Sequence, residues 1–229
     1  MLAELITARF WVDLLEIIGI NILLSGDNAV VIALASRSLP EAQRRIAIIG
    51  GSAAAVVLRI IFCLIITSLL RIPYLKVVGG VLLLYIGVKL VIAEEQADEN
   101  GIAAKSNVAG AIRTILIADA VMSLDNVVAI AAAAQGSILL ITLGLVISVP
   151  LIVFGSQLVL VLLNRFQILV VLGGGLLGWI AGDIILSDPA VCTHLPCDGR
   201  LPQIAKPLLA VLVMAAGTAV AWRTQASGK

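Results

Sequence analysis

Charged side chains are scarce in this sequence, and aromatic side chains are scarcer still. Of its 229 residues, 13% are charged and 4% are aromatic, whereas 61% are hydrophobic. A water-soluble domain carries about a quarter charged residues, so this chain has too few polar side chains to cover a water-facing exterior. The formal net charge of +1, without a basic patch interleaved with aromatic residues, excludes a typical nucleic-acid binder. The composition therefore predicts an integral membrane protein with the lipid bilayer around it.

Histidine and cysteine are also rare, with one and three residues in the chain. We find no pairing of a nucleophile with a base, no phosphate-binding loop and no cofactor motif, so the sequence predicts neither an enzyme nor an organic cofactor. Cys192 and Cys197 flank His194 in the segment CTHLPC, which is an incomplete ligand set for zinc. A disulfide and a pair of free thiols both remain open for these two cysteines.

Seven apolar runs are long enough to cross a bilayer, because a spanning helix needs about 20 mostly apolar residues. They cover residues 10–36, 45–70, 74–93, 108–134, 138–163, 167–187 and 204–222. The polar segments between them contain most of the proline, as turns do. The predicted fold is an all-α transmembrane bundle of seven helices, which forms a single membrane domain over residues 1–229.

The distribution of lysine and arginine predicts how the bundle is oriented. With seven spans the two termini face opposite sides, and more basic residues fall on the side that holds the C-terminus. Since cytoplasmic loops carry the excess of basic residues, we expect the N-terminus outside and the C-terminus in the cytoplasm. The segment with Cys192 and Cys197 then faces the oxidising side, where a disulfide can persist.

An internal repeat relates the two halves of the chain. Residues 24–35 read LSGDNAVVIALA and residues 122–133 read MSLDNVVAIAAA, with seven of twelve positions identical. A weaker match pairs GGVLLLYIGVK at 79–89 with GGGLLGWIAGD at 173–183. These matches assign three helices to each copy.

We therefore predict two three-helix repeats, at residues 10–93 and 108–187, with the helix at 204–222 appended. Because each repeat has an odd number of spans, the second copy enters the membrane upside down relative to the first. Inverted repeats of this kind are typical of secondary transporters, whose binding sites lie near the bilayer midplane at the repeat interface.

Each repeat carries an aspartate–asparagine pair within an apolar run, at Asp27–Asn28 and at Asp125–Asn126. Ionisable residues inside spans are costly, and they mark substrate or ion pathways. Two converging aspartates repel each other unless they are protonated or bridged by a cation. We expect the pair to share one divalent ion, and the oxygen ligands suit Mn²⁺, Ca²⁺ or Mg²⁺.

The local geometry of the first motif stays open. Asn21 and Asn28 share one helix face because they are seven residues apart. In a regular helix Asp27 would point about 120° away from that shared face. A loosened helix beside Asp27 would change this direction, and Gly26 permits such loosening. Leu124 replaces the glycine in the second copy, which favours a regular helix there.

Several other polar residues can support the site or serve the packing alone. Three of them lie beside the motifs and can simply bond neighbouring helices: Asn21, Ser25 and Ser123. Lys89 and Asp183 occupy matching positions of the two repeats, and we expect them to pair with each other. Arg59 is either a counter-charge for the site or a side chain that reaches toward an interface.

The two motifs together, LLSGDNAVVIALA and DAVMSLDNVVAIA, resemble the signature pair of the TerC family of membrane proteins, in its short YjbE-like branch. The resemblance covers nearly the whole chain. It implies a place in the LysE transporter superfamily, the bacterial cytoplasmic membrane as location, and manganese efflux as activity. The family pattern has an acidic residue six positions before each motif aspartate. Asp119 meets it, whereas Asn21 stands where a glutamate is usual, which removes one charge from the expected site.

Carried onto matching positions, the resemblance implies five cation ligands: Asp27, Asn28, Asp119, Asp125 and Asn126. The expected activity is export of a divalent metal cation, with Mn²⁺ as the transported substrate and protons as the coupling ion. Two alternatives remain open. The chain could export small organic solutes, with Arg59 anchoring a carboxylate, or it could be a non-transporting membrane scaffold for metal resistance or metallation.

Overall fold

The computed structural model describes residues 8–69, 72–100, 107–134, 137–166, 168–197 and 199–227. Within these ranges the chain is helical and contains no strand. The helices are α1 (Ala8–Leu24), α2 (Gly26–Ser36), α3 (Glu41–Leu69), α4 (Leu75–Asn100), α5 (Val108–Ala133), α6 (Ile138–Arg165), α7 (Ile168–Leu186), α8 (Pro189–Cys192) and α9 (Arg200–Ser227).

The predicted spans match these helices closely. In the described part of the chain, six helices are long and apolar enough to cross a membrane, and the bent pair α1–α2 makes a seventh span if it is counted as one. Large apolar side chains cover the outside, for example Leu23 at 82% and Phe154 at 68% exposed. Since such a surface is unfavourable in water and suits lipid, the fold is that of an integral membrane protein.

The first span is bent by 52° between α1 and α2. The break lies at Ser25, whose φ of −109° and ψ of 9° depart from the helical values. Gly26 follows, and no atom of the described neighbouring segments lies within 4 Å of the place that a Cβ would occupy there. In contrast, α5 continues through the second motif without interruption. The sequence left open whether the helix is regular or loosened beside Asp27. The structure shows it loosened in the first copy and regular in the second.

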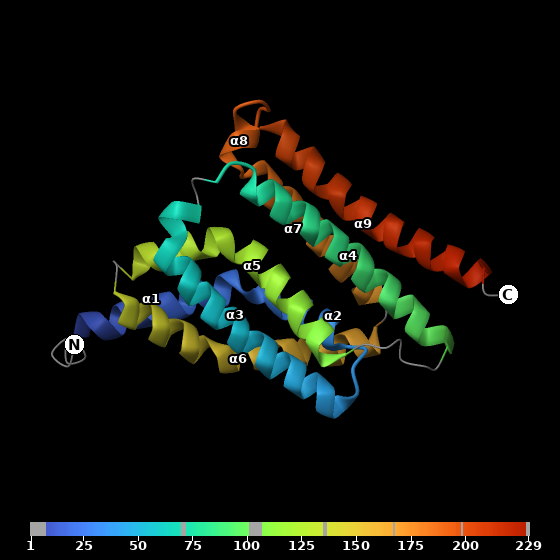
Figure 1. Ribbon diagram of the computed structural model, residues 1–229, viewed down its shortest axis with the longest axis horizontal. Helices are drawn as coiled ribbons and strands as arrows, with labels where there is room; N and C mark the ends of the chain where they lie inside the picture. Colours follow the sequence, from blue (N-terminus) through green and yellow to red (C-terminus); the bar gives the residue numbers. More distant parts are fainter. Residues whose placement is uncertain are drawn as a thin grey trace.

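The helices form two groups, which Figure 1 separates clearly. One group contains α4, α7 and α9, which pack side by side along most of their lengths. In the other group α6 packs against α1 and α2, while α3 packs against α5. The core of this second group includes the fully buried Ile17, Ile130 and Leu145. Both Asp-Asn motifs lie in this group, because α2 and α5 belong to it.

The helices of the first group approach closely at glycines. A Cβ on Gly178 of α7 would lie 2.6 Å from the carbonyl oxygen of Leu209 and 2.9 Å from the Cα of Ala210, both in α9. Backbone atoms cannot turn aside as a flexible side chain can, so this contact requires glycine.

The segment between α7 and α9 contains the four-residue helix α8 and a disulfide. Cys192 and Cys197 are bonded, with their Cα atoms 5.2 Å apart, which decides between the alternatives left open by the sequence. Asp188 is buried and accepts hydrogen bonds from the backbone N–H of Ala190 at 2.9 Å and of Lys76 at 3.1 Å. These bonds join the segment to the first turn of α4.

Substituting the glycine at the α7–α9 contact tests this packing. Gly178→Ala should destabilise the protein by about 1–3 kcal/mol, because the new methyl group overpacks against backbone. The matched control is Gly19→Ala in α1, where nothing lies within 4 Å of the new Cβ. Thermal unfolding of both variants in one detergent measures the effect. Equal melting temperatures for the two variants would contradict the described contact.

Candidate functional site

Arg59 of α3 lies at the centre of a buried polar cluster and is only 2% exposed. Its Nη2 donates to Oδ1 of Asp119 at 2.5 Å, and its Nε donates to Oγ of Ser123 at 3.0 Å. Its Nη1 donates to Oδ1 of Asn21 at 2.5 Å and to Oγ of Ser25 at 2.9 Å. All three guanidinium nitrogens therefore donate to side-chain oxygens from α1, from the bend after it and from α5.

The carboxylate of Asp119 is satisfied by three donors. Besides the Arg59 ion pair, its Oδ1 accepts from Nδ2 of Asn28 at 3.1 Å, and its Oδ2 accepts from Oγ of Ser123 at 3.1 Å. The positive and negative charges of the pair cancel, and their hydrogen bonds offset part of the cost of removing both from water. We call these six residues the Arg59 cluster: Asn21, Ser25, Asn28, Arg59, Asp119 and Ser123.

The two repeats contribute to the cluster through equivalent positions. Asn21, Ser25 and Asn28 are spaced by four and three residues, and Asp119, Ser123 and Asn126 have the same spacing. Residues at these intervals lie on one helix face, which explains why the cluster draws on both copies.

Asn126 is the exception among the equivalent positions. Its Nδ2 donates to the carbonyl oxygen of Leu24 at 3.0 Å, and that carbonyl lies at the bend between α1 and α2. The asparagine of the second motif therefore supports the break in the first copy.

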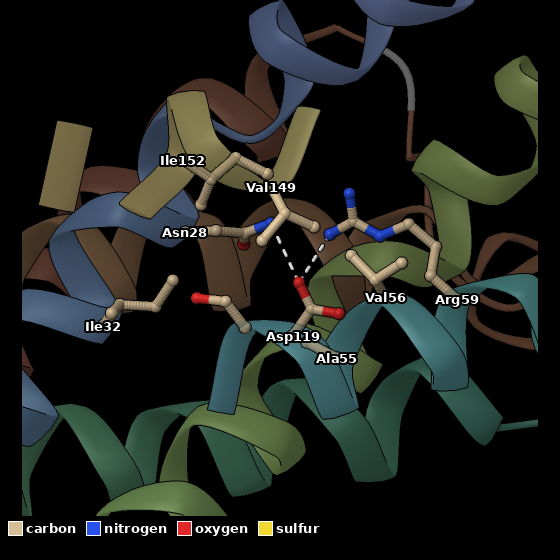
Figure 2. A pocket seen from close by; sticks show the side chains of 9 residues that line it. Asn28, Ile32, Ala55, Val56, Arg59, Asp119, Val149 and Ile152 are labelled. Atoms are coloured by element: carbon tan, nitrogen blue, oxygen red, sulfur yellow. Dashed lines mark hydrogen bonds and ion pairs between the residues drawn. The ribbon is translucent and has the colours of Figure 1, made fainter. Parts of the chain in front are cut away.

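A small cavity adjoins the Arg59 cluster between α2, α3, α5 and α6. Figure 2 shows Asn28, Arg59 and Asp119 at its polar side, with apolar side chains such as Ile32 and Ile152 around them. The centre of a water molecule can occupy about 10 Å³ of this cavity, so the cavity holds about one water. Two buried oxygens that line the cavity have no hydrogen-bond partner among the described residues: Oδ1 of Asn28 and Oγ of Ser52.

The two motif aspartates are not members of this cluster. The carboxylate of Asp27 is partly buried and accepts a bond from the backbone N–H of Asn28 at 2.9 Å. Asp125 forms an ion pair with Lys76, and it accepts a hydrogen bond from Oγ of Ser187 at 3.4 Å. In the part of the chain that the structure describes, no group of three or more acidic, histidine or cysteine residues is arranged to hold a metal. The cation beside the buried carboxylate of Asp119 is instead a guanidinium.

One predicted pairing is wrong. Asp183 forms its ion pair with Lys206 of α9, whereas Lys89 was expected as its partner. The reason is that α9 packs on the same side of α7: a Cβ on Gly182 would lie 3.2 Å from the Cα of Lys206. The repeat relates Lys89 to Asp183 in sequence, but the appended helix supplies the contact.

Sequence reasoning missed Ser52 and the two lysines that pair with acidic residues. Ser52 precedes Arg59 by seven residues on α3, so a search for polar residues on the Arg59 face would have found it. Lys76 and Lys206 carry no such signal, because each lies near the start of its helix and reaches its partner only through packing between helices.

Comparisons with known proteins agree with the fold. The family model described as "Integral membrane protein TerC family" matches residues 6–228. "Uncharacterized membrane protein YjbE" from Bacillus subtilis (strain 168) is 42% identical over 202 residues, which cover 88% of this chain and 91% of that protein. "Uncharacterized membrane protein YkoY" from the same organism is 26% identical over 202 residues, covering 80% of this chain and 62% of the relative. No solved structure matches the chain significantly.

Two matched substitutions compare the stability contributed by the buried Arg59–Asp119 pair with that contributed by the more exposed Lys76–Asp125 pair. Asp119→Asn leaves the guanidinium of Arg59 buried without an anion and should destabilise the protein by about 3–5 kcal/mol. Asp125→Asn removes a carboxylate that is 48% exposed, and its loss should cost about 1 kcal/mol or less. Thermal unfolding of both variants in the same detergent is the measurement. Similar losses for the two variants would show that the Arg59–Asp119 pair does not have the structural weight assigned here.

Proposed function

Because this chain belongs to the TerC family of integral membrane proteins, we propose that it is a secondary transporter that exports a divalent metal cation, with Mn²⁺ as the leading substrate. The observation that carries the proposal is the set of buried side-chain oxygens contributed by both Asp-Asn repeats to the Arg59 cluster. Carboxylate, carboxamide and hydroxyl oxygens are the ligands that hard divalent cations prefer. Asp119 lies near the middle of α5, a depth at which a charged side chain is a functional candidate by default.

The helix pairing supports an inverted-repeat mechanism. Exchanging the helices of the two repeats converts the α3–α5 contact into the contact of α6 with α1 and α2, and it leaves the α4–α7 contact unchanged. A two-fold relation in the membrane plane has this property. We infer alternating access in which one repeat moves against the other around the Arg59 cluster.

The motif residues outside the cluster have proposed roles along the same path. Asp27 has no cationic partner among the described residues, so its carboxylate is free to join the substrate ion next to Asn28. Asp125 lies with Lys76 at the start of α4, on the same side as the disulfide segment, where it would meet the cation at the exit. Asn126 holds the bend and would follow any change in it.

Export requires an energy source. Moving two positive charges outward against an inside-negative potential costs about 4.6 kcal/mol per 100 mV. Proton antiport supplies this energy, because carboxylates bind the metal when ionised and release it when protonated from outside.

The organic-solute alternative depended on Arg59 as an anchor for a carboxylate. All three guanidinium nitrogens already donate to protein oxygens, which disfavours that role. The scaffold alternative is an outcome of the transport experiment below.

Reconstituted vesicles test both substrate and coupling. Purified protein in liposomes should move Mn²⁺, and a one-unit pH gradient should shift its steady-state distribution roughly tenfold per exchanged proton, since one unit corresponds to about 1.4 kcal/mol. Movement of Mn²⁺ that ignores the pH gradient would refute the coupling. Vesicles that move no Mn²⁺ would favour the scaffold.

The motif aspartates provide the matching genetic test. The double variant Asp27→Ala, Asp125→Ala should abolish manganese tolerance and raise cellular manganese, while Asp13→Ala, near the start of α1, serves as the control and should leave both unchanged. Metal content of cells with and without each variant is the measurement. Normal tolerance in the double variant would contradict the assigned role.

We also propose that the disulfide segment faces outside, with the C-terminus in the cytoplasm. In a Cys63→Ser background, Cys192 and Cys197 should react with an impermeant maleimide on intact cells. This labelling should require prior treatment with an impermeant reductant, which opens the disulfide. Labelling that requires broken cells would reverse the orientation.

A further inference from the structure

The cation that occupies the oxygen cluster in this structure belongs to the chain itself. Arg59 donates hydrogen bonds to four side-chain oxygens, and all four belong to residues that the sequence singles out around a metal site: Asn21, Ser25, Asp119 and Ser123. Oδ1 of Asn21 and Oδ1 of Asp119 each already accept two hydrogen bonds, one of them from Arg59, so a metal ion can bind either atom only if a donor leaves it.

Charge balance leads to the same conclusion. Asp119 and Arg59 are together neutral, and among the described residues the one other carboxylate next to the cluster is Asp27, which precedes Asn28. A divalent ion that entered while Arg59 kept its place would leave excess positive charge in a poorly solvated interior, where like charges repel strongly. If Arg59 withdraws, the carboxylates of Asp27 and Asp119 balance the two charges of the ion.

The adjoining cavity offers the arriving ion its first ligands. Oδ1 of Asn28 and Oγ of Ser52 line it, and both residues are at most 4% exposed. Within the described ranges neither atom has a hydrogen-bond partner. Buried polar atoms are nearly always hydrogen-bonded, so both oxygens are available to whatever enters this water-sized space, whether a water or a cation. The space reaches Asp119 and Arg59 directly (Figure 2).

We propose that Arg59 is a tethered cation that holds the oxygen cluster in the ion-free state, and that a divalent cation entering beside Asn28 and Ser52 displaces it from Asp119. This inference rests on the proposed function and adds the exchange step to it. The flexible stem of arginine allows the guanidinium to withdraw while α3 stays in place. Return of Arg59 to Asp119 then helps to expel the ion, so the residue sets the balance between binding and release.

The test compares Mn²⁺ binding with Mn²⁺ transport in the full chain. Arg59→Gln should bind Mn²⁺ roughly tenfold more tightly in nanodisc calorimetry, since a competing ligand has been removed, yet its turnover in liposomes should fall to background. A residue needed only for structure would lose affinity and transport together. Weaker or unchanged Mn²⁺ binding in folded Arg59→Gln overturns the proposal.

Two further variants keep the test decisive. If Arg59→Gln does not fold, Arg59→Lys replaces it: a lysine keeps the charge with fewer fixed donors, so Mn²⁺ should bind several-fold more tightly and turnover should be reduced. Binding as weak as or weaker than in the unmodified chain would again overturn the proposal. Ser52→Ala should weaken Mn²⁺ binding several-fold at an unchanged melting temperature, and unchanged affinity would remove the cavity from the path.

The unmodified protein separates the two proposals. If it neither binds nor moves Mn²⁺, the proposed function fails, and the exchange step fails with it. If it moves Mn²⁺ while the Arg59 variants bind no more tightly, only the tethered-cation inference is overturned.

Discussion

An arginine and an aspartate can face each other deep in a membrane-spanning bundle only when the surrounding donors and acceptors are matched to them, because neither charge is solvated there. Arg59 meets this condition through four bonds to side-chain oxygens, and Asp119 meets it through three donors. The pair therefore dictates which faces of α1, α3 and α5 turn inward. Packing of the remaining helices is compatible with that choice, since α4, α7 and α9 form their own closely packed group.

The buried charge pair also changes the picture of the candidate site. Two repeated aspartates suggested a carboxylate pair bridged by a guest ion, but the buried carboxylate is Asp119, six residues before the second motif aspartate. Its partner comes from α3, which carries neither motif. The Arg59–Asp119 pair is thus neutral in this structure, and the five cation ligands stay a prediction.

How far the sequence predicts this molecule depends on the range of each interaction. The spans were predictable because apolar length is a local property, and the faces of Asn21 and Asp119 followed from helical spacing. The sequence allowed either a regular or a loosened helix at Gly26. Choosing between the two required knowing how the neighbouring helices pack. Partners such as Lys206 for Asp183 were beyond reach, because they depend on where an appended helix docks.

The bend at Ser25 makes the two copies of one motif mechanically unequal. The first copy consists of the two helices α1 and α2, which meet at a bend where no described side chain fills the space beside Gly26. The second copy lies within the single unbroken helix α5. Asn126 of α5 donates a hydrogen bond to the carbonyl oxygen of Leu24, which lies at the bend of the first copy. Any local movement of these two motifs should therefore bend the chain at Ser25, because α5 has no comparable break in its copy.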